Sequence, residues 1–177
     1  MLEHATLMLG SINAHLSIFI TWFFAVAFLY NLTISINVKN RSVMFLSLIM
    51  MVSYTLTLII GKAQLMITTS FYLDFALSDV VAIFAIVTFS HFYKAPYSIA
   101  YYYLILGLSL NAMLFLVMHY DYAVLANYDY WWGWGLYAIG QVSSDIIMAL
   151  VLIINKDILG LVKLKNAVLN RKAPVAR

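Results

Sequence analysis

Residues 76–89 read ALSDVVAIFAIVTF, an apolar run in which Asp79 is the only charged residue. Residues 141–154, QVSSDIIMALVLII, repeat this arrangement around Asp145. With their apolar flanks, both stretches reach the length of about 20 residues at which an α-helix crosses the hydrocarbon core of a bilayer. They therefore predict two membrane-spanning helices, each with an acid at a depth where lipid replaces water.

The rest of the chain has the same apolar character. Of its 177 residues, 65% are hydrophobic and 10% are charged, and the mean hydropathy is +0.95. Soluble domains carry about 25% charged residues, so this chain lacks the polar surface that a water-soluble globule needs. We therefore expect an integral membrane protein. The chain has no cysteine, which excludes disulfides, thiolate metal sites and cysteine nucleophiles.

The apolar segments that are long enough to span a membrane are joined by short polar connections. Membrane β-barrels are excluded, because their strands are segments of about ten residues with alternating hydrophobicity. We expect an all-α integral membrane protein with five transmembrane helices and short loops. The predicted spans are residues 13–36, 42–60, 70–92, 97–118 and 130–154, which form one transmembrane domain over residues 1–154, followed by a basic tail over residues 155–177.

The basic residues predict the orientation of these helices. Nine of the ten Lys and Arg residues follow the first, third or fifth predicted span, and only Lys62 follows the second. Because loops rich in Lys and Arg are retained in the cytoplasm, we expect a cytoplasmic C-terminus and an outer N-terminus in a plasma membrane or bacterial inner membrane. This asymmetry also accounts for the net charge of +3 without a nucleic-acid partner.

Aromatic residues collect at both predicted membrane boundaries. Residues 119–135, HYDYAVLANYDYWWGWG, are rich in Tyr and Trp at the outer boundary, and residues 101–103 are three consecutive tyrosines near the inner one. This placement is typical of an aromatic belt at the level of the lipid headgroups.

The C-terminal tail has apolar residues set among four cations, Lys163, Lys165, Arg171 and Lys172. In one interpretation it is an amphipathic helix on the inner leaflet, with its cations near anionic headgroups. In the other it is a solvated segment that only enforces the topology, because a helix this short is marginal alone. In both cases it offers the main cytoplasmic surface for a soluble protein partner.

The two mid-span acids are the main candidate functional residues. An Asp at the centre of a span costs about 2.5–3.5 kcal/mol on insertion. Asp79 and Asp145 precede the inner boundary by about 22 and 16 Å, at 1.5 Å per residue, so they lie at similar depths. No Lys or Arg falls within the predicted spans, so each acid is protonated or contacts water or a cation. The polar residues expected to share their path are Ser78, Asn111, Gln141 and Ser144.

Two functions follow from these residues. The leading hypothesis is an oligomeric channel or carrier for protons or small ions that uses this polar path. The alternative is a non-transporting membrane subunit, such as an effector, immunity or assembly protein. In that case the acids act as glue between helices, and a protein partner binds the helices or the basic tail.

Other chemistry is less well supported by the sequence. No catalytic motif occurs, so we expect no enzymatic activity, and no cofactor is predicted. Three residues near the outer boundary, His15, His119 and Asp121, form a candidate metal site, because imidazole and carboxylate groups are common metal ligands.

Overall fold

The structure is a computed structural model that describes residues 2–38, 40–94, 97–129 and 131–170, with helix side chains from His15 to Ala167. These residues form α-helices and one π-helical turn, and they contain no strand. Five of the helices are long and apolar enough to cross a membrane. The elements are α1 (Leu2–Ser35), α2 (Ser42–Lys62), α3 (Phe71–Tyr93), α4 (Ile99–His119), the π-helical turn η1 (Tyr120–Val124), α5 (Trp132–Ile154) and α6 (Leu161–Asn170).

The five predicted spans are all helices, and two of their boundaries differ from the prediction by more than two residues. α1 begins at Leu2 and not at residue 13, and within its described side chains His15–Ser35 is long and apolar enough to span a membrane. The fourth span was expected to end at residue 118, whereas α4 runs into η1 and the apolar helical stretch extends over Ile99–Val124. The sequence between α4 and α5 contains no Gly or Pro that would stop the helix, so helical structure continues past Asp121.

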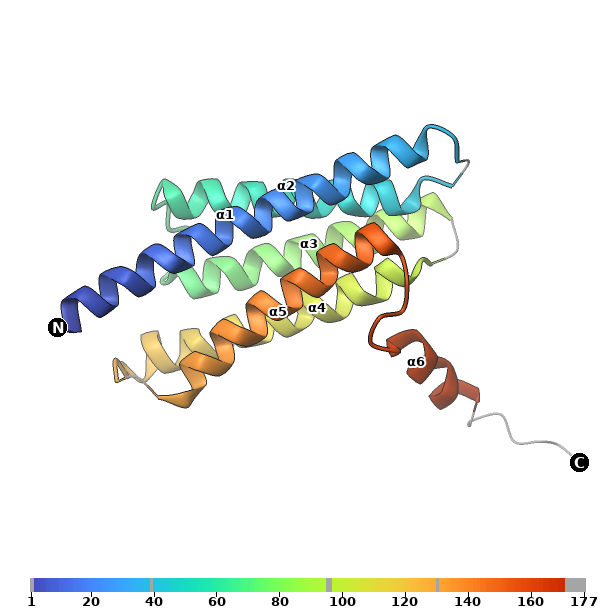
Figure 1. The fold of residues 1–177 in the computed structure, drawn as a ribbon. Coiled ribbons are helices and arrows are strands. Elements are labelled where there is room, and N and C mark those ends of the chain that lie inside the picture. The colour runs from blue at the N-terminus through green and yellow to red at the C-terminus, as the bar shows by residue number, and fades with distance from the viewer. Residues whose placement is uncertain (1, 39, 95–96, 130, 171–177) are drawn as a thin grey trace, which may run out of the picture.

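The five long helices form a closed bundle in sequence order. Each helix packs against the next one along the chain, and α5 completes the circuit by packing against α1. Figure 1 shows the first and last spans side by side along most of the length of α5. α2 also contacts α4 and α5 across the bundle. A single chain therefore encloses an interior to which every long helix contributes.

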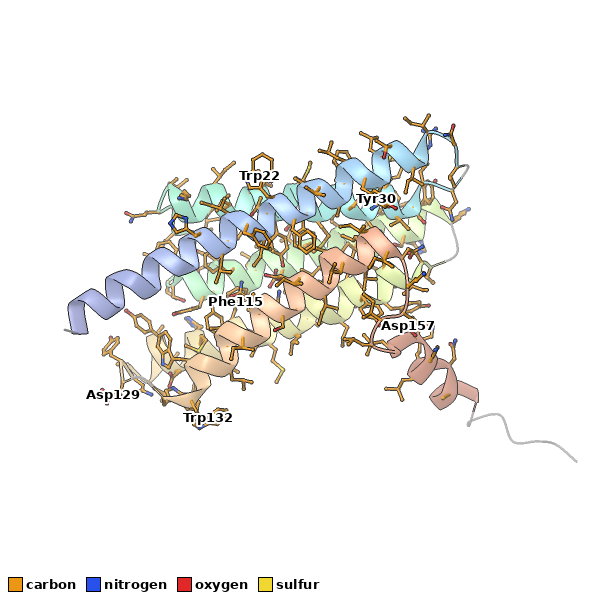
Figure 2. The ribbon with its side chains drawn as sticks, in the orientation of Figure 1. Trp22, Tyr30, Phe115, Asp129, Trp132 and Asp157 are labelled. Atoms are coloured by element: carbon orange, nitrogen blue, oxygen red, sulfur yellow. The ribbon has the colours of Figure 1, made fainter. Side chains whose placement is uncertain are left out.

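The loops divide the bundle into two ends. The α1–α2 and α3–α4 connections lie at the end that also carries α6; we call it the basic end, because Arg41, Lys94 and Lys163 lie there. The α2–α3 and α4–α5 connections lie at the opposite end, which we call the aromatic end. Figure 2 shows Asp129 and Trp132 at the aromatic end and Asp157 at the basic end.

The outer surface of the bundle is apolar over all its faces. Trp22, Phe84 and Ile139 are 67%, 71% and 71% exposed on three different helices, and Trp22 projects from α1 in Figure 2. An apolar surface of this extent is unstable in water and suits lipid. The interior is packed by large side chains that are fully buried, among them Phe24, Met50, Ile86, Leu108 and Met148.

Candidate functional site

Asp145 of α5 is the centre of a polar cluster inside the bundle. Its side chain is 1% exposed. Its Oδ1 accepts hydrogen bonds from Nδ2 of Asn111, at 2.6 Å, and from the hydroxyl of Tyr54. The same Asn111 amide also donates to the Tyr54 hydroxyl oxygen at 3.4 Å. One carboxylate oxygen thus joins α2, α4 and α5.

Asp79 brings a second acid from α3 to the same region. It is 7% exposed, and it lies within electrostatic range of both Asp145 and Tyr54. α1 contributes the ring of Phe24, whose centroid is 4.3 Å from that of Tyr54. We refer to Tyr54, Asp79, Asn111 and Asp145 as the acid cluster.

The acid cluster has more acceptors than donors. Oδ2 of Asp79, Oδ2 of Asp145 and Oδ1 of Asn111 are buried and have no hydrogen-bond partner among the described residues. The four helices that supply the cluster contain no Arg, and their one Lys is Lys62, the last residue of α2. Two ionised carboxylates without a counter-ion are very costly in such a site. A proton on a carboxyl group removes one charge and supplies one missing donor.

A close contact between α4 and α5 sets the cluster in place. The Ser144 hydroxyl donates to the Gly107 carbonyl at 3.3 Å. A Cβ at position 107 would collide with the side chain of Met148 and lie 3.1 Å from Oγ of Ser144. Because Asn111 is one helical turn beyond Gly107 and Asp145 directly follows Ser144, this contact places the amide against the carboxylate.

A second contact holds α1 against α5 on the basic side of the cluster. Asn31 is 8% exposed and donates from Nδ2 to the backbone carbonyl of Leu152, at 2.9 Å, and to that of Ala27 in its own helix, at 2.8 Å. Leu152 lies in the last turn of α5, where backbone carbonyls have no donor within the helix, so Asn31 supplies the donor that this carbonyl lacks. This hydrogen bond joins the first and last spans where the bundle closes.

The structure brings together some of the residues that the sequence singled out and separates others. Asp79, Asp145 and Asn111 share the acid cluster, and Ser144 lies next to it. Ser78 instead faces α2, where its hydroxyl lies 2.7 Å from that of Thr57. Gln141 is half-buried on α5 and makes no hydrogen bond with the cluster.

Two tyrosines of the site were not singled out in the sequence. Tyr54 was overlooked because tyrosine is expected at membrane boundaries; its position near the middle of a span was the available signal. Tyr137 lies two turns before Asp145 on α5 and is within electrostatic range of both acids. Its ring packs edge-on against Tyr72, at a centroid distance of 5.9 Å, and Tyr72 packs in the same way against Tyr122. These contacts lead from the acid cluster to the aromatic end.

The candidate outer metal residues have separate partners. Nδ1 of His119 lies 2.7 Å from the hydroxyl of Ser70, and His15 is exposed on α1. Asp121 is 6% exposed and accepts from Nδ2 of Asn127 and Nε1 of Trp131, each at 2.9 Å. In the part of the chain that the structure describes, no group of three His, Asp or Glu side chains is arranged to hold a metal ion. Asp121 therefore fixes the connection between α4 and α5, and His119 joins the end of α4 to the start of α3.

Comparisons with protein-family models, with curated proteins and with solved structures found no match. The chemistry of the acid cluster is therefore the basis for a function. Two carboxyl groups, a phenol and an amide at this depth can hold, release and pass protons or contact a small cation.

Proposed function

We propose that this multi-spanning membrane protein transfers protons across the bilayer through the acid cluster, with Asp79 and Asp145 as the exchanging groups. One observation carries the proposal: two buried carboxyl groups leave acceptor oxygens without donors, in helices that have no cation at that depth. Such a site is satisfied when it holds exchangeable protons, a bound cation or water that donates to the free oxygens. Ionisable groups within membrane spans commonly serve in proton relays.

Packing around the cluster favours protons over hydrated ions. Phe24, Ile86, Leu108 and Met148 are all less than 2% exposed and fill the bundle interior. A hydrated ion needs a continuous wide path. A proton needs only neighbouring groups that can exchange it, with single waters between them.

The two acids have different roles in this proposal. Asp145 is held by Asn111 and Tyr54, so its orientation is fixed. Asp79 accepts no side-chain hydrogen bond from a described residue, whereas Asp145 accepts two, so the carboxyl group of Asp79 is the freer of the two to exchange a proton. The Tyr54 hydroxyl bonds Asp145 and lies within electrostatic range of Asp79, which suits it to connect them.

Polar groups also lie toward each end of the bundle. Toward the aromatic end, Tyr137 and Tyr72 supply hydroxyl groups. Toward the basic end, a cavity of about 10 Å³ has room for about one water and is lined partly by Ser42, Ser90 and Ser98. By the distribution of Lys and Arg, we take the basic end as cytoplasmic. Because the bundle closes within one chain, the path does not require the oligomer expected from the sequence.

The alternative function uses the same contacts as structural glue. Hydrogen bonds that join three helices at Asp145 also stabilise a bundle that only binds a protein partner. In that case the protein carries no protons, and the partner binds its lipid-facing helices or α6. Measured proton flux separates the two.

The test is proton flux in proteoliposomes that contain the purified full-length chain and an internal pH-sensitive dye, with a potassium diffusion potential as the driving force. We expect flux above that of protein-free liposomes, and its loss in Asp145→Asn, which keeps the shape and acceptor oxygen but cannot exchange a proton. Asp129→Asn is the matched control, because Asp129 is exposed at the aromatic end. Wild-type flux equal to that of empty liposomes would overturn proton transfer and leave the glue function.

A further inference from the structure

The hydroxyl of Tyr103 fastens the segment after α5 to the basic end of α4. It donates to Oδ1 of Asp157 at 2.6 Å and accepts from the backbone N–H of Leu159 at 2.7 Å. Oδ2 of Asp157 accepts from the backbone N–H of Lys163, at 3.0 Å, in the first turn of α6. We call Tyr103 and Asp157 the latch, because together they join the start of α6 to the bundle.

The ionised form of Asp157 favours the closed latch. Partial burial opposes the charged form of Asp157, but hydrogen bonds from Tyr103 and from backbone N–H groups of α6 outweigh it and lower the pKa of this carboxyl group. A carboxylate at a helix N-terminus is also favoured by the helix dipole. The start of α6 is therefore held in a fixed place.

The held segment exposes apolar side chains beside lysines. Ile158, Leu159 and Leu164 are 47%, 58% and 63% exposed. Lys163 is exposed among them, and Nζ of Lys165 lies 3.8 Å from the centroid of the Tyr102 ring. Figure 1 shows α6 beyond the end of α5 and inclined to the bundle. Exposed apolar residues with neighbouring lysines are typical of helices that lie in a membrane interface.

We propose that the latch holds α6 in the lipid interface at the basic end, where its apolar side chains enter the leaflet and Lys163 and Lys165 contact anionic headgroups. Two observations favour lipid over a protein partner. The exposed apolar residues begin four positions after the last residue of α5, Ile154, and so lie at the membrane boundary. The charges nearest to them on α6 are positive, which complements an anionic leaflet.

The proposal revises the sequence interpretation of the tail. Lys163 and Lys165 keep the role expected of them, while Arg171 and Lys172 lie outside the described residues. The structure adds the latch, which the sequence did not indicate, and with it a reason for α6 to form although a helix this short is marginal alone. This inference does not rest on proton transfer.

The test uses the absence of cysteine in the chain. A single Leu164→Cys variant carries a fluorophore and is reconstituted at full length in phosphatidylcholine vesicles, with or without phosphatidylglycerol, that contain a lipid-borne quencher. We expect strong quenching with phosphatidylglycerol and weak quenching without it. In the same labelled chain, Lys163→Gln should lower the ratio of inserted to detached α6 roughly fivefold, the usual contribution of one lysine near an anionic surface.

Asn166→Cys, labelled in the same way, is the control, because Asn166 is an exposed polar position on α6. Leu164 is also exposed, so both variants should elute from detergent as the wild type does. Quenching that does not depend on lipid charge would overturn headgroup recognition. An unquenched label at position 164 in both vesicle types would overturn the interface placement and point to a protein partner.

Discussion

Two pairs of buried aspartates in this protein differ in whether their oxygens have partners. Asp74 and Asp121, near the aromatic end, are 5% and 6% exposed, and both oxygens of each accept a hydrogen bond. Asp79 and Asp145 are buried to a similar degree, at 7% and 1%, yet each has a buried oxygen without a donor among the described residues. Burial alone therefore does not mark a functional acid.

The partners explain what the first pair does. Asp74 accepts from the backbone N–H groups of Ile67 and Thr68 and so closes the α2–α3 connection. Asp121 closes the α4–α5 connection through two side chains. A carboxylate that has all its donors in the loop next to it stabilises that loop and has no need of a proton. Asp79 and Asp145 each lack a donor for one buried oxygen, so a proton on the carboxyl group would be favourable there.

The largest effect should come from removing the exchangeable proton. We expect Asp79→Asn to reduce proton flux in proteoliposomes by about a hundredfold, the usual scale for a proton-transferring group, and to leave detergent stability unchanged. Asp121→Asn should leave flux per folded molecule unchanged, because Asp121 lies outside the proposed path. Equal loss of flux in both variants would erase the functional difference between the two pairs.

The next effect is on stability, where we expect the loss of Asp121 to cost more than the loss of Asp79. Asp121→Ala leaves the amide of Asn127 and the indole N–H of Trp131 without their acceptor. An orphaned buried donor costs about 1–3 kcal/mol. Because both donors are half-buried, we expect the low end of this range and a downward shift of thermal unfolding in detergent. Asp79→Leu should cost less than this, since no side-chain donor depends on Asp79. A larger loss of stability in Asp79→Leu would make Asp79 a structural acid.

The sequence was sufficient to predict the five long apolar helices and the position of the two acids along α3 and α5. Hydrophobic length defines spans in a bilayer whatever their neighbours are, and helical rise gives depth. The buried stripe on α3 that contains Asp79, Ala82 and Ile86 also follows from helical spacing. These features depend on one helix at a time.

The sequence could not predict which polar residues meet. Ser78 and Gln141 were expected to join the acids as Asn111 does, but they do not, and Ser109 and Thr55 are further polar residues within the helices. In the structure both are exposed, and each bonds a carbonyl of its own helix four residues earlier, that of Ile105 and that of Met51. Helices that are apolar on all faces carry no pattern that fixes their rotation, so the choice among polar residues depends on packing.

Gly107 provides a test of that packing, with an intermediate effect. Gly107→Ala forces the side chains of Met148 and Ser144 away from α4. Overpacking of this kind costs about 1–3 kcal/mol, and it should also move Asn111 off Asp145 and lower flux. Gly61→Ala is the matched control, because its added Cβ would make only ordinary contact with Phe75 at 3.8 Å. If the two variants unfold at the same temperature, the contact at Gly107 does not set the cluster.

The smallest effect concerns the latch. Its aspartate, Asp157, resembles Asp74 and Asp121, whose carboxylate oxygens all accept hydrogen bonds. Both oxygens of Asp157 accept hydrogen bonds, and its pKa is lowered. Docking of α6 lowers the pKa of Asp157. The docked state is therefore stabilised at pH values above the ordinary Asp pKa of about 3.9. This stabilisation is lost as the pH falls through the lower pKa of the docked state. Hydrogen exchange of the α6 amides, corrected for the intrinsic pH dependence of exchange, should therefore show constant protection between about pH 8 and pH 5.

Tyr103→Phe completes this prediction, because it removes the first of the hydrogen bonds that lower the pKa of Asp157. Tyr103→Phe removes both hydrogen bonds of the hydroxyl, to Asp157 and from Leu159. Protection of the α6 amides should therefore fall at pH 7 by roughly fivefold for each lost bond, and should begin to decline at a higher pH than in the wild type. Tyr102→Phe is the control, since it keeps the aromatic ring under Lys165. Loss of protection in the wild type between pH 7 and pH 6 would mean that the pKa of Asp157 is raised, and would place this residue with Asp79 and Asp145 among the acids that lack donors.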